Sequence, residues 1–127
     1  MKTDWNNLFK IRIRNCDDSF QKHEVIKLLI VMKLLKKHNK RSFIRIYTEF
    51  DLEGLIPDVY FEDIKSKSVV CYEIQKDFSK KWLEEKTKQY NNYQVPFMNS
   101  VDFIPINLNE CPDNIQEINN WLEKYII

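Results

Sequence analysis

The segment Val69–Gln75, which reads VVCYEIQ, decides the fold of this chain. Because β-branched, aromatic and other apolar residues dominate it, we expect a largely buried strand. A carboxylate is costly to bury in a strand without a partner, so Glu73 is a candidate functional group. The stretch Asp58–Glu62 (DVYFE) predicts a neighbouring strand, because Pro57 cannot donate a ladder hydrogen bond and marks the end of the preceding turn.

Helix and strand signals also precede this pair. A long apolar run predicts a buried helix over Phe20–Leu35, with basic residues near its C-terminal dipole. Its candidate N-caps are Asp17, Asp18 and Ser19. Alternating residues predict a strand over Phe43–Phe50, and a turn follows at Asp51–Pro57 that holds Gly54, the single glycine. Asp63–Ser68 predicts a polar connection between the two strands described first.

The C-terminal half predicts a helix, a strand and a last helix. Ser79 can cap a helix with lysines and glutamates on one side. The apolar positions expected on its other side are Trp82, Leu83, Thr87 and Tyr90. Val101–Leu108 predicts a fourth strand, and Pro112 suits the first turn of a last helix. The apolar positions of that helix are Ile115, Ile118, Leu122 and Tyr125.

The order of elements is therefore αβββαβα. A three-stranded meander followed by a helix and a further strand predicts an α/β fold with a mixed sheet and helices on both faces. The length of 127 residues predicts one domain, 1–127, without a linker. Residues 1–17 form an N-terminal extension that we leave unassigned, because Phe9, Ile11 and Ile13 alternate like a strand whereas Trp5, Leu8 and Phe9 fit a helical turn.

Composition excludes several classes of protein. The chain is 43% hydrophobic and 31% charged with a net charge of +1, so disorder is not expected. A single glycine argues against glycine-rich phosphate loops and dinucleotide fingerprints. With no long uncharged apolar run and no secretory signal, we expect a soluble cytoplasmic protein that does not enter membranes. The three cysteines, Cys16, Cys71 and Cys111, lack zinc-site spacing and should be reduced.

Acidic residues converge where the predicted strands meet. Asp58 begins the second strand and Glu73 lies inside the third, so neighbouring strands can bring both carboxylates to one end of the sheet. Such a pair attracts a hard cation, and Mg²⁺ usually takes only one or two protein carboxylates. Gln75 shares a strand face with Glu73 and can orient water or phosphate. Glu49, near the end of the first strand, is a candidate third acid.

These residues resemble the PD-(D/E)XK nuclease superfamily, in which a Pro-Asp and a hairpin precede an acid, any residue and a lysine. The matching parts are Pro57-Asp58 and Glu73-Ile74-Gln75, within the αβββαβ order of a restriction-endonuclease-like or Holliday-junction-resolvase-like core. The resemblance covers roughly residues 42–108 and includes a Gln89-Tyr90 pair in the following helix, which implies an auxiliary role for those two residues.

The resemblance implies a Mg²⁺- or Mn²⁺-dependent nuclease acting on double-stranded or branched DNA. Asp58 and Glu73 would bind the metal, the Ile74 carbonyl would assist, and Glu49 would be an auxiliary ligand. Gln75 would be the third catalytic residue, although it replaces the usual lysine and carries no charge; Lys76 or Lys80 could compensate. Related nucleases often pair to cut two strands, so a homodimer is also implied.

A basic surface is the expected contact with DNA phosphates. Its candidate members are Lys36, Lys37, Lys40, Arg41, Lys76, Lys80 and Lys81, with Lys86 and Lys88 further along the helix.

Simpler interpretations remain open for each group. Lys36–Arg41 can be a solvated helix end, Asp58 a strand-end residue, Gln75 an amide satisfied by backbone, and Glu49 one half of an ion pair with a lysine. Two alternative functions follow: a catalytically inactive nuclease-like module that binds nucleic acid or protein, and a plain interaction protein.

Overall fold

Residues 18–127 are described by the computed structural model, and they fold around a four-stranded sheet. In chain order the elements are α1 (Asp18–Lys37), β1 (Ile44–Thr48), β2 (Val59–Asp63), β3 (Ser68–Gln75), α2 (Lys80–Asn91), β4 (Ser100–Asn107) and α3 (Ile115–Trp121). Short 3₁₀ segments are η1 (Arg41–Phe43), η2 (Leu108–Glu110) and η3 (Leu122–Tyr125). This confirms the predicted αβββαβα order; the extension before residue 18, with Cys16 and the candidate cap Asp17, lies outside the described residues.

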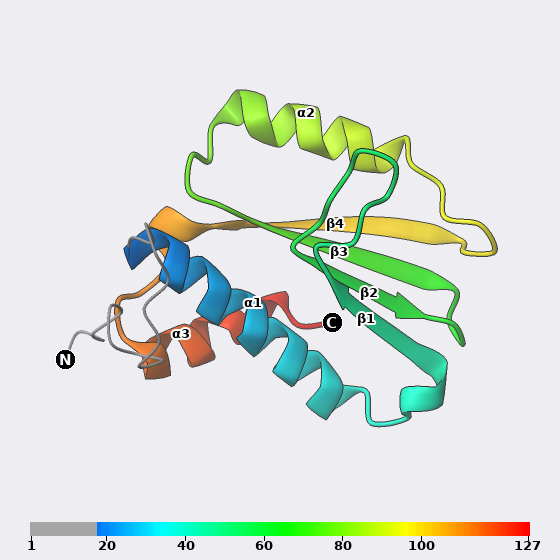
Figure 1. Ribbon diagram of the computed structural model, residues 1–127, viewed down its shortest axis with the longest axis horizontal. Helices are drawn as coiled ribbons and strands as arrows, with labels where there is room; N and C mark the ends of the chain where they lie inside the picture. Colours follow the sequence, from blue (N-terminus) through cyan, green and yellow to red (C-terminus); the bar gives the residue numbers. More distant parts are fainter. Residues whose placement is uncertain (1–17) are drawn as a thin grey trace.

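The sheet is mixed, as predicted. Its strand order is β1-β2-β3-β4, with β1, β2 and β3 antiparallel and β4 parallel to β3. A parallel neighbour needs a crossover connection, and α2 supplies it between β3 and β4. Figure 1 shows α2 on one side of the sheet and α1 with α3 on the other, so helices cover both faces.

Strand periodicity divides the buried residues between two cores. Alternate residues of β2 and β3, such as Phe61 and Tyr72, pack with α1 and the C-terminal helix. The other set, such as Tyr60 and Cys71, packs against Tyr90 of α2. Because both faces of β3 are covered, five of its eight residues are buried, which fits the apolar run that predicted it.

Local signals set most element ends. Ser79 caps α2, since its Oγ accepts a hydrogen bond from Trp82 N at 3.0 Å. Gly54 has φ 105° in the turn before β2, a left-handed conformation that favours glycine. Pro112 does not begin the last helix: Asn114 is its N-cap, accepting from Gln116 N at 2.9 Å, because an amide oxygen can cap whereas proline cannot.

The structure also bears on the predictions about membrane helices and about the cysteines. Within residues 18–127, no helix has the length and apolar character needed to cross a membrane. Cys71 and Cys111 are both buried free thiols, as predicted for reduced cysteines. Burial raises the pKa of Cys71 to about 12, so this thiol stays protonated and behaves as a small core residue.

Candidate functional site

Asp58 directly precedes β2, and Glu73 lies inside β3. The ladder between these strands ends at the pair Val59–Tyr72, so Asp58 and Glu73 are the next residues beyond it on each strand. Asp58 N donates to Tyr72 O at 2.9 Å, so the regular register does not extend to Asp58. As the sequence predicts, the two carboxylates lie near one end of β2, close enough for the charge of Asp58 to raise the pKa of Glu73.

Asp58 is held by groups from β3 and α1. Its Oδ2 accepts a hydrogen bond from Ile74 N at 2.7 Å, and its Oδ1 lies 3.1 Å from His23 Nε2. Both side chains of the second contact are about four-fifths buried, with exposed fractions of 19% for Asp58 and 21% for His23. Burial lowers the pKa of His23, but the hydrogen bond and charge of Asp58 outweigh it, so the pKa is raised overall.

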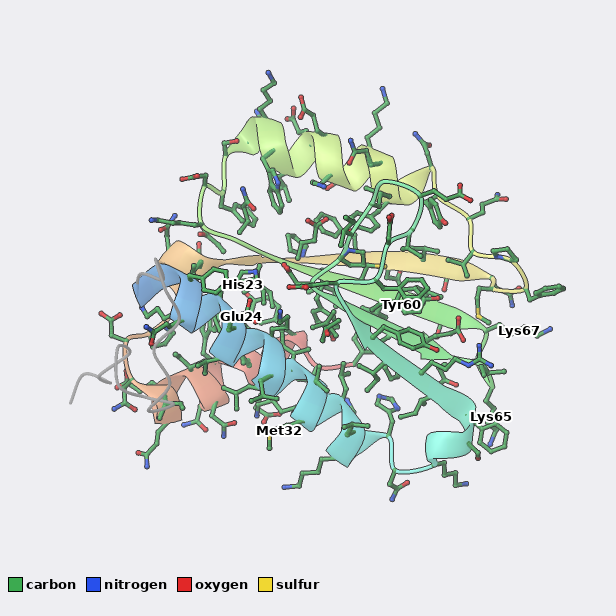
Figure 2. All side chains as sticks on the ribbon, viewed as in Figure 1. His23, Glu24, Met32, Tyr60, Lys65 and Lys67 are labelled. Carbon is green, nitrogen blue, oxygen red and sulfur yellow. The ribbon has the colours of Figure 1, made fainter. Side chains whose placement is uncertain are left out.

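The α1 side of the site continues as a chain of charges. Glu24 lies between His23 and Lys27, with its oxygens 3.3 Å from His23 Nδ1 and 2.7 Å from Lys27 Nζ. Figure 2 shows His23 and Glu24 on the first half of α1, beside the sheet. The local sequence pattern does not assign this cluster a role, although polar residues inside a mostly buried helix are a usable signal for one.

Glu49 is joined to Asp58 through the backbone, since Glu49 N donates to Asp58 O at 3.2 Å, but its carboxylate pairs with Lys27. Its carboxylate is 64% exposed and lies 2.9 Å from Lys27 Nζ, as the ion-pair alternative allowed. Its backbone has φ 53°, a left-handed turn directly after β1. Among residues 18–127, no three His, Cys, Asp or Glu side chains are gathered as a ready metal-binding set. The two carboxylates are therefore the acidic donors that the geometry offers.

Glu73 faces α2 and is less satisfied than Asp58. Its side chain is only 12% exposed, and Oε2 lies 3.6 Å from Lys86 Nζ without a hydrogen bond. The Tyr90 hydroxyl is directed at Glu73, yet it too is buried without a hydrogen bond of good geometry. Burial raises the pKa of Glu73; Tyr90 and Lys86 oppose this, and the negative charge of Asp58 adds to it.

The inner side of α2 differs from the prediction at one position. Thr87 is exposed, whereas Lys86 and Trp82 are partly buried and Tyr90 is fully buried. In a helix, residues four apart share a face, so Lys86 and Tyr90 both reach Glu73. Of the two predicted auxiliary residues, Tyr90 joins the site and Gln89 is exposed. The sequence predicts a surface position for Lys86, because a charged side chain is usually exposed.

Gln75 and its neighbours line a hollow beside the acid pair. The Gln75 amide donates to Asp77 O at 3.3 Å, so backbone already satisfies one of its donors. The hollow has a volume of about 410 Å³ and is lined by Phe20, His23, Ile74, Gln75, Lys76, Asp77 and Leu108. A larger one of about 740 Å³ lies between α1 and the C-terminal helix, but its carboxylate is Glu123, paired with Lys33. The smaller hollow is thus the better candidate.

The predicted basic surface is split between two ends of the molecule. Lys76, Lys80 and Lys81 are exposed around the β3–α2 connection, next to the site. Lys36, Lys37 and Lys40 lie at the far end of α1 (Figure 1), and the side chain of Arg41 is outside the described set. Fourteen residues of helix separate Lys37 from His23, about 21 Å at 1.5 Å per residue. Of these two groups, the first is the one that follows Glu73 and Gln75 directly in the chain.

No family model, curated protein or solved structure was found to match this chain. The inferences below therefore rest on the residues and geometry described above.

Proposed function

We propose that this chain is a Mg²⁺- or Mn²⁺-dependent nuclease of the PD-(D/E)XK type that hydrolyses DNA phosphodiester bonds. The observation that carries the proposal is that Asp58 and Glu73 both follow the last β2–β3 pair, with Glu73 Oε2 buried and without a hydrogen bond. A buried carboxylate oxygen left unpaired is costly, and sites that retain such a cost are frequently functional.

The donor set fits a hard cation. Asp58 already contacts His23 and Ile74 N, but a carboxylate has about four lone-pair sites, so two contacts leave it free to bind a metal. Glu73 offers Oε2, which has no hydrogen bond and lies 3.6 Å from Lys86 Nζ. Mg²⁺ commonly uses one or two carboxylates and completes its octahedron with water and phosphate oxygens. A cation bound here would lower the pKa of water and neutralise charge on the scissile phosphate.

The protein's own groups would position the reactants. In hydrolysis the water oxygen forms a bond to phosphorus, the bond to the leaving oxygen breaks, and one water proton ends on that leaving oxygen. Asp58 is fixed by Ile74 N and His23, so its oxygens need little reorganisation. The exposed lysines Lys76, Lys80 and Lys81 support the proposal as contacts for the flanking phosphates.

Metal-dependent cleavage of labelled linear, nicked and branched DNA tests the proposal. We expect cutting with Mg²⁺ or Mn²⁺ by the native chain, and a loss of at least about 100-fold in Asp58→Asn and Glu73→Gln. Glu84→Gln is the matched control, because Glu84 is a 67%-exposed carboxylate on α2. Cutting that persists in both site variants at the native rate would sink the proposal and indicate a contaminating nuclease.

A second candidate function is a catalytically inactive module that binds nucleic acid. It is favoured by the glutamine at position 75, whose amide is engaged by Asp77 O, and by the near-neutral net charge of +1. Under this alternative, DNA binding persists without cutting on every substrate and is insensitive to Mg²⁺. Binding measured by fluorescence anisotropy, with and without the metal, separates the two functions.

A further inference from the structure

The lysine in contact with the acid pair comes from α2 and not from β3. Lys86 Nζ lies 3.6 Å from Glu73 Oε2, and the Lys86 side chain is 25% exposed. It is therefore partly desolvated and yet open to a ligand. The other lysines near the site differ: Lys76 is exposed on the strand connection, and Lys80 is 90% exposed and lies 3.9 Å from Glu84.

Position 75 cannot supply this charge. Gln75 lies two residues beyond Glu73 and points to the same face of β3, but its side chain is neutral. Phosphoryl transfer builds negative charge on the nonbridging oxygens, which positioned cations stabilise. The neutral amide of Gln75 and the partly buried ammonium of Lys86 on α2 are thus complementary features of one site.

We propose that Lys86 is a catalytic residue whose ammonium contacts the scissile phosphate and replaces the charge that Gln75 does not provide. The inference rests on the proposed nuclease function. At 3.6 Å the contact with Glu73 Oε2 is longer than a hydrogen bond, so it does not lock the ammonium in one geometry. The ammonium has three donors and a flexible stem, which allow it to stay near Glu73 and reach a phosphate oxygen.

A purely structural ion pair predicts different behaviour. If Lys86 only positions Glu73, its removal weakens metal binding and cutting together. If Lys86 acts on phosphate, its removal takes a positive charge away from Glu73 and leaves that carboxylate a better metal ligand. Metal affinity then rises while cutting falls. These opposite directions distinguish the two roles without reference to the size of either effect.

The test compares Lys86→Ala with Lys65→Ala, an exposed lysine in the β2–β3 turn that is outside the candidate DNA surface and serves as a charge-matched control. For Lys86→Ala we expect kcat to fall by about 100-fold or more, in the range seen when one stabilising group is removed. Lys65→Ala should leave both KM and kcat within about twofold. Mn²⁺ titration of the DNA-free protein should show tighter binding in Lys86→Ala than in the native chain.

Rescue completes the experiment. A lysine placed by Gln75→Lys shares the strand face of Glu73, so Lys86→Ala/Gln75→Lys should recover at least about 10-fold in kcat. Unfolding curves confirm that each variant is folded. Native cutting with equal kcat losses in the two single variants, or Mn²⁺ affinity that falls in Lys86→Ala, would overturn the role of Lys86 alone. Absence of cutting by the native chain would overturn the proposed function and this inference together.

Discussion

Two buried tyrosines on opposite faces of the sheet differ in how their hydroxyls are bonded. On the α1 face, the buried Tyr72 hydroxyl donates to Tyr125 O at 2.7 Å inside an otherwise apolar core. On the α2 face, Tyr90 OH and Glu73 Oε2 are buried without hydrogen bonds. Adjacent residues of one strand, Tyr72 and Glu73, thus differ because consecutive side chains point to opposite faces.

The difference separates stability from chemistry. The α1 face joins α1, the sheet and the C-terminal helix in one continuous core, so it should carry most of the folding free energy. The α2 face has a smaller core, and its unpaired polar atoms reduce stability instead of adding to it. Changes on the first face should therefore unfold the protein, and changes on the second should alter function and pH response.

The largest expected effect is a cavity in the α1 face. Ile30 is fully buried at 0% exposure, so Ile30→Ala should lower the free energy of unfolding by about 2–5 kcal/mol. Leu28, at 50% exposure on the same helix, is the control, and Leu28→Ala should cost less than about 0.5 kcal/mol. Urea denaturation measures both. Equal losses would show that α1 does not pack as described.

Asp58 stands between the two faces and should have the next largest effect. Asp58→Ala leaves Ile74 N without its acceptor and removes the partner of His23, so we expect a loss of about 1–3 kcal/mol. The pKa of His23 is raised above its ordinary 6.5, so this pair stabilises fully below pH 6.5 and less as the pH rises through the raised pKa.

The loss in Asp58→Ala should therefore be greater at pH 6 than at pH 9. Urea curves at the two values measure it, and NMR titration should show a lower pKa for His23 in the variant. A loss independent of pH would mean that His23 and Asp58 do not interact as charges.

A matched pair of tyrosines tests the contrast between the faces most directly. Tyr72→Phe removes a hydroxyl that has a 2.7 Å acceptor, and should cost about 0.5–1.5 kcal/mol. Tyr90→Phe removes a buried hydroxyl without a hydrogen bond and should cost less, or stabilise. Thermal unfolding of both variants in one buffer ranks them. The reverse order would contradict the assignment of stability to the α1 face.

The smallest expected effect is a change in how the free energy of unfolding varies with pH. Burial holds the pKa of Glu73 above its ordinary 4.5, so the folded state keeps this proton at pH values where the unfolded chain has lost it. The stabilisation of the folded state by this retained proton is fully present below pH 4.5. It is lost as the pH rises through the raised pKa of Glu73. Glu73→Gln should remove that decline, which unfolding curves from pH 4 to 8 measure. Parallel curves for the two proteins would exclude Glu73 as the cause.

Much of the fold could be predicted because its signals are local. The apolar run of β3, the Ser79 cap and the Gly54 turn each depend on neighbours in the sequence, and all lie as expected. The nearness of Asp58 and Glu73 also follows from strand order, since consecutive antiparallel strands bring the start of one beside the end of the next.

The rest depended on packing between distant elements. The carboxylate of Glu49 forms an ion pair with Lys27 of α1, and nothing near either residue in the sequence indicates that pairing. Charged residues are mostly exposed, so Lys86 was expected on the solvent side of α2. In the structure it lies on the inner side of this helix, beside Glu73. His23 reaches Asp58 only because α1 crosses the sheet at that point.

The sequence by itself therefore determined the order of elements, the mixed sheet and the acid pair, because periodicity, caps and turns act over a few residues. Only the tertiary structure decided which groups surround that pair. The angle and depth at which α1 and α2 pack on the sheet place His23 against Asp58 and Lys86 against Glu73. Those contacts join residues 35 and 13 positions apart, beyond the reach of any local pattern.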